Sequence, residues 1–196
     1  MARRSFNLSS YAYLTVSVCP YSPTCTINIH KSVYSHEPVD IKLSRREWQC
    51  LANFLPNLYA TAKTMQDDVR ASKPVENHEE PKRLSDRFLL TLSAFEAPNG
   101  KTFITTGIRR YFTNQEGKEI PKREGGVNLS FEELESLFAL MTEITEEITV
   151  SVENYKMVRM CSSRAIAEVT KVAEDFMHSG EGYFRLLLNK PETTML

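Results

Sequence analysis

The sequence predicts an α+β fold made of two tandem repeats, each an antiparallel sheet followed by a helix, with a helical extension at the C-terminus. Alternating apolar and polar runs, which have the period of β-strands, occur in two sets with a similar order. Each set ends in a serine that precedes an amphipathic helix, and a polar segment with two prolines separates the sets. The predicted boundaries are 9–63 for the first repeat, 64–86 for the linker, 87–149 for the second repeat and 150–196 for a strand and helix extension.

The first repeat is expected to hold three strands and one helix. Its strands are expected at residues 11–18, 26–34 and 39–44, which are rich in β-branched residues. The helix that follows carries an apolar stripe at Trp48, Leu51, Leu55 and Leu58. Because proline lacks an amide hydrogen and clashes with the preceding turn, Pro56 is expected to kink or end this helix.

The second repeat shows the same order of elements. Its strands are expected at residues 88–95, 102–112 and 126–130, with a turn at Gly117 and a basic hairpin around Pro121. The apolar stripe of its helix lies at Leu134, Leu137, Phe138, Met141 and Ile144. Residues 131–149 hold six glutamates and no base, so we expect a solvated acidic face that repels nucleic acid.

The joins between the last strand and the helix are the best-matched parts of the two repeats. Ser44 and Ser130 each stand where a hydroxyl would accept an unpaired amide hydrogen of the helix. Glu47 and Glu133 follow three residues later, which is the spacing of a capping box. The aligned pairs are Ile41 with Val127, Leu43 with Leu129, Trp48 with Leu134 and Leu51 with Leu137. Two such joins indicate an internal repeat.

The C-terminal region has no counterpart in the first repeat. Residues 148–158, ITVSVENYKMV, resemble a further strand, because they begin with a β-branched run. Residues 162–180 predict a capped helix that ends at Gly180, and residues 182–188 predict a short apolar strand or helix tail.

Composition limits the classes of function. With 196 residues, 41% hydrophobic residues and no apolar run near the ~20 residues of a membrane span, the chain is expected to be globular and to have no membrane span. The net charge of −1 hides a segregation, because residues 1–63 hold seven bases against three acids and residues 87–130 hold seven against four. The first residues, MARRSF, have a bias similar to that of a transit peptide.

Side chains that could hold a metal ion or act as nucleophiles are scattered along the chain. The four cysteines form no Cys-x-x-Cys pair, so we expect free thiols rather than a zinc site, with a Cys19–Cys25 bridge as the alternative. The four histidines are not spaced with cysteines or carboxylates, and the chain has neither a P-loop nor a GxGxxG motif. We therefore expect a protein that is not an enzyme and uses no cofactor or metal.

Residues 104–129 place basic and aromatic side chains next to each other on expected strands. This combination suits single-stranded nucleic acid, because cations contact phosphates and aromatic rings stack on bases. The candidate binding residues of the second repeat are Lys101, Arg109, Arg110, Tyr111, Phe112, Lys118, Lys122 and Arg123. Those of the first repeat are His30 and Lys31, which align with Arg109 and Arg110, together with Lys42.

The segment TGIRRYFTNQEGKEIPKREGGVNLSFEELESL, residues 106–137, resembles the single-stranded-DNA-binding domain of the positive-cofactor-four transcriptional coactivators. The matching positions are Ile108, Arg109, Tyr111, Phe112, Gly117, Pro121, Lys122, Arg123, Gly126, Val127 and Leu129. The resemblance covers residues 88–145 and, more weakly, residues 11–60.

This resemblance implies a curved antiparallel sheet followed by a helix, in which two copies dimerise through their helices. Here one chain supplies both copies, which is similar to the tandem arrangement of the Whirly proteins and implies an intramolecular pseudo-dimer, either monomeric or part of a higher homo-oligomer. The implied function is sequence-tolerant binding of single-stranded DNA in transcription, replication or repair, with transcription or replication proteins as further partners. The alternatives are an RNA-binding or annealing protein and a protein-interaction scaffold. The implied location is the nucleus, with the mitochondrion as the alternative.

The resemblance also raises a geometric difficulty. It places both Arg109 and Phe112 on the side of the ligand, but a regular strand alternates its side chains and puts them on opposite faces. A bulge or the end of the strand is therefore expected nearby. In the first repeat the corresponding link is seven residues shorter and lacks the basic hairpin, so we expect that repeat to bind more weakly and mainly to complete the pseudo-dimer.

Overall fold

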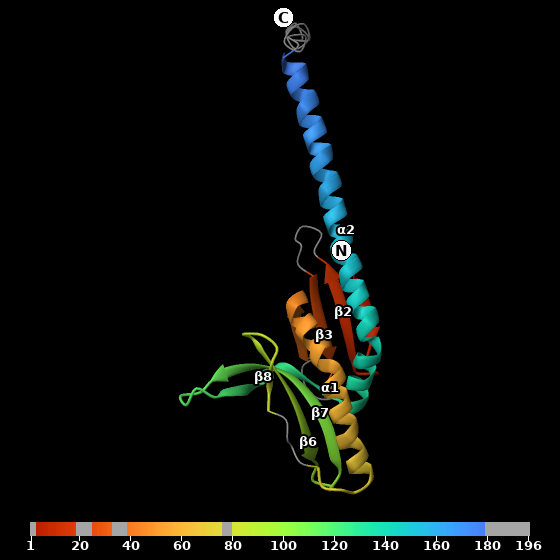
Figure 1. The fold of residues 1–196 in the computed structure, drawn as a ribbon, viewed down its shortest axis with the longest axis vertical. Helices are drawn as coiled ribbons and strands as arrows, with labels where there is room; N and C mark the ends of the chain where they lie inside the picture. The colour runs from red at the N-terminus through yellow and green to blue at the C-terminus, as the bar shows by residue number, and fades with distance from the viewer. Residues whose placement is uncertain (1–2, 19–24, 33–38, 76–79, 179–196) are drawn as a thin grey trace, which may run out of the picture. The chain divides into compact units, whose positions relative to one another are not determined.

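The computed structural model describes residues 3–18, 25–32, 39–75 and 80–178 (Figure 1). In these residues the fold is α+β, with two antiparallel four-stranded sheets and two helices, the second of them long. Residues up to Val152 form one compact unit, and residues from Glu153 onward form another. No helix in the described ranges is long and apolar enough to span a membrane.

The first sheet has the strand order β1-β2-β3-β4 and is followed by α1. The strands are β1 (Arg3–Asn7), β2 (Ala12–Val18), β3 (Cys25–Lys31) and β4 (Val39–Ser44), and the helix is α1 (Arg45–Arg70). In β3, Ile27 and Ile29 are buried while Asn28 and His30 are on the other face, as period-two alternation requires.

The second sheet repeats this plan with the order β5-β6-β7-β8 and is followed by α2. The elements are β5 (Lys82–Arg83), β6 (Phe88–Glu96), β7 (Thr102–Thr113), β8 (Glu119–Ser130) and α2 (Phe131–His178). Ile108 is opposite Val127 here, as Ile29 is opposite Ile41 in the first sheet. The pairing thus bears out the alignment of the two repeats.

One hydrophobic core joins both sheets, α1 and α2 as far as Val152. The expected stripe of α1 is buried, and Trp48 donates a hydrogen bond of 3.1 Å from Nε1 to Thr145 Oγ1 on α2. The ring of Tyr59 on α1 stacks on Phe138 of α2 at 4.6 Å. Each of these two contacts between the helices thus includes one residue of a predicted stripe, Trp48 on α1 and Phe138 on α2.

The strand expected at residues 148–158 is wrong, because α2 is continuous from Phe131 to His178. Ile144, Ile148 and Val152 recur every four residues and are buried. This helical period outweighs the preference of the β-branched run for a strand. The capped helix expected from residue 162 is likewise a part of α2, and the segment 182–188 lies outside the described residues.

Two further expectations about α1 and the linker need correction. Pro56 does not end α1, which continues to Arg70 because Leu58, Ala62 and Met65 extend its buried stripe. Pro56 itself is exposed, so the carbonyl that it leaves unpaired in the helix can reach water. Residues 64–70 are thus helical rather than linker, and β5 occupies residues 82–83 of the same expected linker.

Three further details concern β1, Pro121 and the cysteines. β1 precedes the expected start of the first repeat and pairs with β2, with Phe6 opposite Leu14. Pro121 lies within β8 rather than in a hairpin of its own, which an edge strand tolerates because the missing amide need not pair. Cys19 lies outside the described residues, and Cys25 is a buried free thiol.

Candidate nucleic-acid interface

The face of the second sheet that points away from the core combines small polar residues with two phenylalanines. Along β6, Leu90 and Leu92 belong to the core, so Ser93 and Phe95 lie on the opposite face. Ser93 is opposite Thr105 on β7, and their hydroxyls are 3.3 Å apart. This face, which we call the outer face, is therefore polar at its middle positions on β6 and β7.

An exposed aromatic pair lies at one end of the outer face. Phe95 and Phe103 are opposite each other on β6 and β7, and 58% and 42% of their surfaces are exposed. The ammonium of Lys101 lies 5.1 Å from the centre of the Phe103 ring. Neither phenylalanine was among the expected binding residues. The signal was present, because both occupy positions where the alternation calls for a polar side chain.

Arg109 holds a fixed position at the other end of the outer face. Its Nε donates to Asn128 Oδ1 at 3.0 Å, and its Nη1 donates to the Lys122 carbonyl at 3.2 Å. Gly107 lies beside it, and a Cβ there would be 2.5 Å from Thr91 Oγ1. The glycine is therefore required by the close approach of its neighbours, and Arg109 is oriented before any ligand arrives.

The expected bulge is present, and it lies on β8. Arg109 is opposite Gly126 and Tyr111 is opposite Pro121, so a step of two residues on β7 faces a step of five on β8. Gly125, with φ of 80°, supplies the left-handed backbone of this irregularity, beside the Arg110 side chain. A bulge increases the local twist, so the faces of the hairpin beyond it do not simply continue those of the sheet.

Beyond the bulge, β7 and β8 continue as a two-stranded hairpin, because β6 pairs only as far as Arg110 (green, Figure 1). Phe112 is 46% exposed on this hairpin, and Lys118 closes its turn through a backbone bond of 2.8 Å to Asn114 Oδ1. Lys122 is exposed as well. The side chain of Arg123 lies outside the described residues.

The Tyr111 side chain is held by residues just before β6. We call the part of the first unit with the first sheet and α1 the first half, and the part from Arg83 to Val152 the second half. Its hydroxyl lies 3.5 Å from the Ser85 carbonyl, and the Arg83 guanidinium lies 5.6 Å from the centre of its ring. Tyr111 is half-buried as a result. Of the aromatic residues expected to stack on bases, Phe112 is therefore more accessible than Tyr111.

In the first sheet, the expected residue His30 lies on the corresponding outer face. Its ring stacks on Tyr13 at 4.7 Å with an interplanar angle of 20°, and Thr15 Oγ1 lies 3.4 Å from its Nε2. Tyr13 is 39% exposed. Lys42 is exposed on β4, opposite Asn28. This face thus has an aromatic side chain and a cation, but no extended hairpin in the described residues.

The structure places Lys31 in a contact between the two halves. Its ammonium lies 2.6 Å from Glu133 Oε2 and donates to the Asn128 carbonyl at 2.7 Å. Ser9 Oγ also donates to Glu133, at 2.9 Å. The Lys31 side chain is 22% exposed, so it is less accessible to a ligand than its alignment with Arg110 suggests.

A matching contact involves Glu47 of the first half. Arg87 Nε and Ser85 Oγ of the second half donate to Glu47 Oε1 at 3.0 and 2.7 Å. Burial alone would raise the pKa of Glu47, but the bonds from Arg87, Ser44 and Ser85 outweigh it and lower the pKa to about 2. The two capping glutamates are thus each neutralised by a base of the other half, a reciprocity that sequence spacing alone does not reveal.

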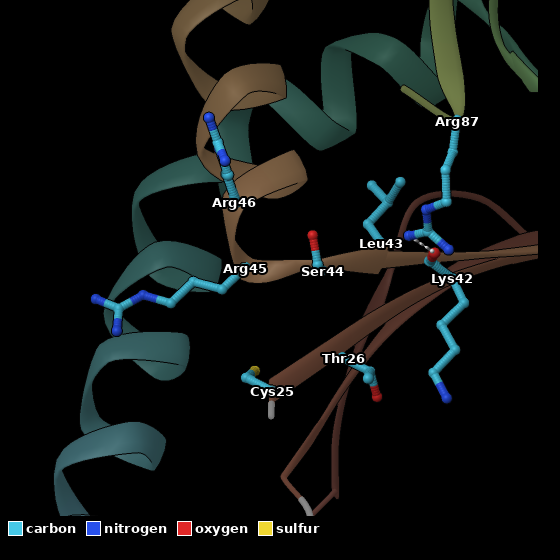
Figure 2. A pocket seen from close by; sticks show the side chains of 8 residues that line it. All are labelled: Cys25, Thr26, Lys42, Leu43, Ser44, Arg45, Arg46 and Arg87. Carbon is cyan, nitrogen blue, oxygen red and sulfur yellow. Dashed lines mark hydrogen bonds between the residues drawn. The ribbon is translucent and has the colours of Figure 1, made fainter. Parts of the chain in front are cut away.

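A pocket of about 340 Å³ lies at the corner between β4 and α1 (Figure 2). Arg87 donates to the Lys42 carbonyl at 3.3 Å on one side of this corner, and Arg45 points to the other side. Arg46 lies on the first turn of α1. Burial raises the pKa of the Cys25 thiol in the lining, so the thiol stays protonated and unreactive. The pocket is basic because four cationic residues line it, Lys42, Arg45, Arg46 and Arg87.

Within the described residues, no three side chains of His, Cys, Asp or Glu are grouped to hold a metal ion. No family model and no curated protein matches this chain, so its residues and their arrangement are the basis for any function assigned to it.

Proposed function

We propose that the protein binds single-stranded DNA with little sequence preference, along the outer face of the second sheet and its hairpin. The observation that carries the proposal is the exposed pair Phe95 and Phe103, with Lys101 beside it. Large exposed aromatic side chains on a polar sheet face offer stacking surfaces for bases, and each base stacked contributes roughly 1–3 kcal/mol.

We assign the phosphate contacts to cations of the outer face and of the hairpin. Arg109 is oriented by two hydrogen bonds, while Lys118 and Lys122 are exposed on the hairpin. Bases that stack on aromatic side chains must be unpaired, so the surface favours a single strand over a duplex. Single-stranded RNA offers the same bases and phosphates, and RNA binding or annealing is the alternative. The sequence tolerance suits roles in transcription, replication or repair.

We also propose that the two halves act as an intramolecular pseudo-dimer. The support comes from the reciprocal contacts of Glu47 with Arg87 and of Glu133 with Lys31, and from the contact of α1 with α2 at Trp48. In this arrangement the first half orients the second and adds Lys42 and the Tyr13–His30 stack as weaker contacts.

Fluorescence anisotropy with labelled single-stranded and duplex oligonucleotides across a salt series tests the function. The K118A/K122A variant should bind single-stranded DNA at least tenfold more weakly and lower the salt slope by about 1.4, since each phosphate contact on a single strand contributes about 0.7. F103A should weaken binding without changing the salt slope, because it removes stacking and no charge.

The control is M157A, which replaces an exposed residue of the second unit and should bind like the native protein. Absent or salt-insensitive binding would overturn the proposal and favour a protein-interaction surface around Phe95 and Phe103. Tighter binding of RNA than of DNA would support the alternative.

A further inference from the structure

The second unit of the chain presents a helix whose side chains are uncovered in the described residues. From Lys156 to Asp175 of α2 (blue, Figure 1), every side chain is exposed. The exposed large apolar residues are Met157, Val158, Met160, Ile166, Val169 and Val172, at 63–72%. Helical stability in proteins comes mostly from packing of an apolar face, so a partner for this helix is to be expected.

Five small or apolar residues form a stripe with an internal symmetry. The stripe consists of Val158, Cys161, Ala165, Val169 and Val172. Ala165 is its centre, because the other members lie four and seven residues before it and four and seven residues after it. Residues at these offsets share one face of a helix. A stripe that reads the same from both ends fits a second copy of itself running in the opposite direction.

The charges of this helix have the matching polarity. Residues 153–164 hold three bases and one acid, and residues 166–177 hold one base and three acids. Two copies in parallel would place like charges together, whereas two antiparallel copies place the basic half of one beside the acidic half of the other.

The polarity is also visible at one flank of the stripe. Arg164 and Glu168 are joined by an ion pair of 3.2 Å, one residue before and three residues after Ala165. Both lie on the same side of the stripe at 100° per residue. In an antiparallel pair centred on Ala165, Arg164 of one copy therefore meets Glu168 of the other.

We propose that the α2 helix beyond Val152 pairs with the same helix of a second copy of this chain, antiparallel, with the two-fold axis at Ala165. Val158 of one copy then packs against Val172 of the other, Cys161 against Val169, and the two Ala165 residues against each other. The small side chain at the centre lets the helices approach closely. This assembly is independent of the proposed function of the sheets.

Site-specific disulfide formation tests both the pairing and its direction in the full-length chain. In a C161S background, A165C should form a covalent dimer on mild oxidation, because the two residues meet at the axis. V158C in the same background should not, because its two copies are fourteen positions apart, roughly 21 Å at 1.5 Å per residue. C161S alone gives the baseline from the other cysteines. Covalent dimers from both variants would indicate a parallel pair and overturn the proposal.

Sedimentation velocity at micromolar concentrations tests the pairing without a crosslink. R164E should lower the dimer fraction several-fold, since it places like charges at both ends of the flank contact, and R164E/E168R should restore it. A chain that stays monomeric at all concentrations would overturn the proposal and leave another segment or another protein as the cover of the stripe. DNA affinity per chain should be the same in all these variants, so a failure here does not bear on the proposed function.

Discussion

The two halves of the first compact unit share their architecture and differ in their surfaces. In both, a strand leads through a capping serine to a helix, with Glu47 and Glu133 closing the capping boxes. The first turn of α1 then carries Arg45 and Arg46, whereas the first turn of α2 carries Phe131 and Glu132. The two halves therefore keep the same capping join and differ in the residue that follows it, since Phe131 is buried and Arg45 is exposed.

The difference at the first helical turn is informative because the N-terminal end of a helix dipole is positive. The positive end of the helix dipole favours acids, which α2 has and α1 lacks apart from Glu47. Arginines at this end are a local cost to stability. Together with Lys42, they give the first half a basic corner, where the second half has Asn128 and Glu132 at the aligned positions. Such a departure from a local rule is typical of a binding surface.

The reciprocal contacts allow the largest test of this comparison. R87M and K31M should each lower the free energy of unfolding by about 3 kcal/mol, because each leaves a capping glutamate with 5% exposure without its base. Chemical denaturation followed by the fluorescence of Trp48, the only tryptophan, measures this.

The matched control for these variants is R110M. Arg110 aligns with Lys31 but is exposed, so its loss should change the free energy of unfolding by less than about 0.5 kcal/mol. Equal effects of K31M and R110M would show that the two halves use this position in the same way and would contradict the comparison.

The next effect is on the pH dependence of stability. The pKa of Glu47 is lowered to about 2 in the folded chain, so the unfolded chain binds the proton more readily. The contribution of Glu47 is therefore complete above pH 5 and is lost as the pH falls toward 2, by about 3 kcal/mol at 1.36 kcal/mol per pH unit. Urea denaturation at a series of pH values should show this loss, and E47Q should lack it. An identical acid dependence in E47Q would contradict the assignment.

A smaller effect is expected at the start of α1, where one substitution should change stability and DNA binding in opposite directions. R46E gives α1 the residue that α2 has at the aligned position, Glu132. It should raise the free energy of unfolding by roughly 0.5–1 kcal/mol through the helix dipole, and it should weaken single-stranded DNA binding. Thermal denaturation and anisotropy measure the two. Unchanged DNA binding would remove the basic corner of the first half from the interface.

An effect of similar size concerns one buried atom. Thr106 Oγ1 has no hydrogen-bond partner within the described part of the chain, although Thr106 is 2% exposed. The aligned residue of the first half is Ile27, which is fully buried. T106V should therefore raise the free energy of unfolding by about 1 kcal/mol. A loss of stability in T106V would indicate that the hydroxyl has a partner of its own.

Features that depend on local sequence could be predicted. Three strands of each sheet, both capping boxes and the stripe at Trp48 and Leu51 follow from period and spacing, whereas β1 and β5 were not expected. The bulge was expected from a conflict between alternation and the resemblance, although it lies on β8 rather than on β7. The failure at residues 148–158 arose because β-branched residues suit both a strand and a buried helix stripe.

Contacts between the halves could not be predicted, because their partners are far apart in the sequence. Ser85 and Arg87 fall in an expected linker and at a repeat boundary, and nothing in their spacing points to Glu47. Lys31 was expected to contact the ligand because it aligns with Arg110, and only the packing of the two halves assigns it to Glu133.

The reciprocal ion pairs between the halves have a consequence for the evolution of the gene. Each half buries an acid whose neutralising base is encoded in the other half. If one half were lost, copied alone or recombined with a related gene, the remaining acid would be buried without its counter-ion. The duplication is therefore difficult to reverse, and substitutions at these four positions should arise in compensating pairs across the gene.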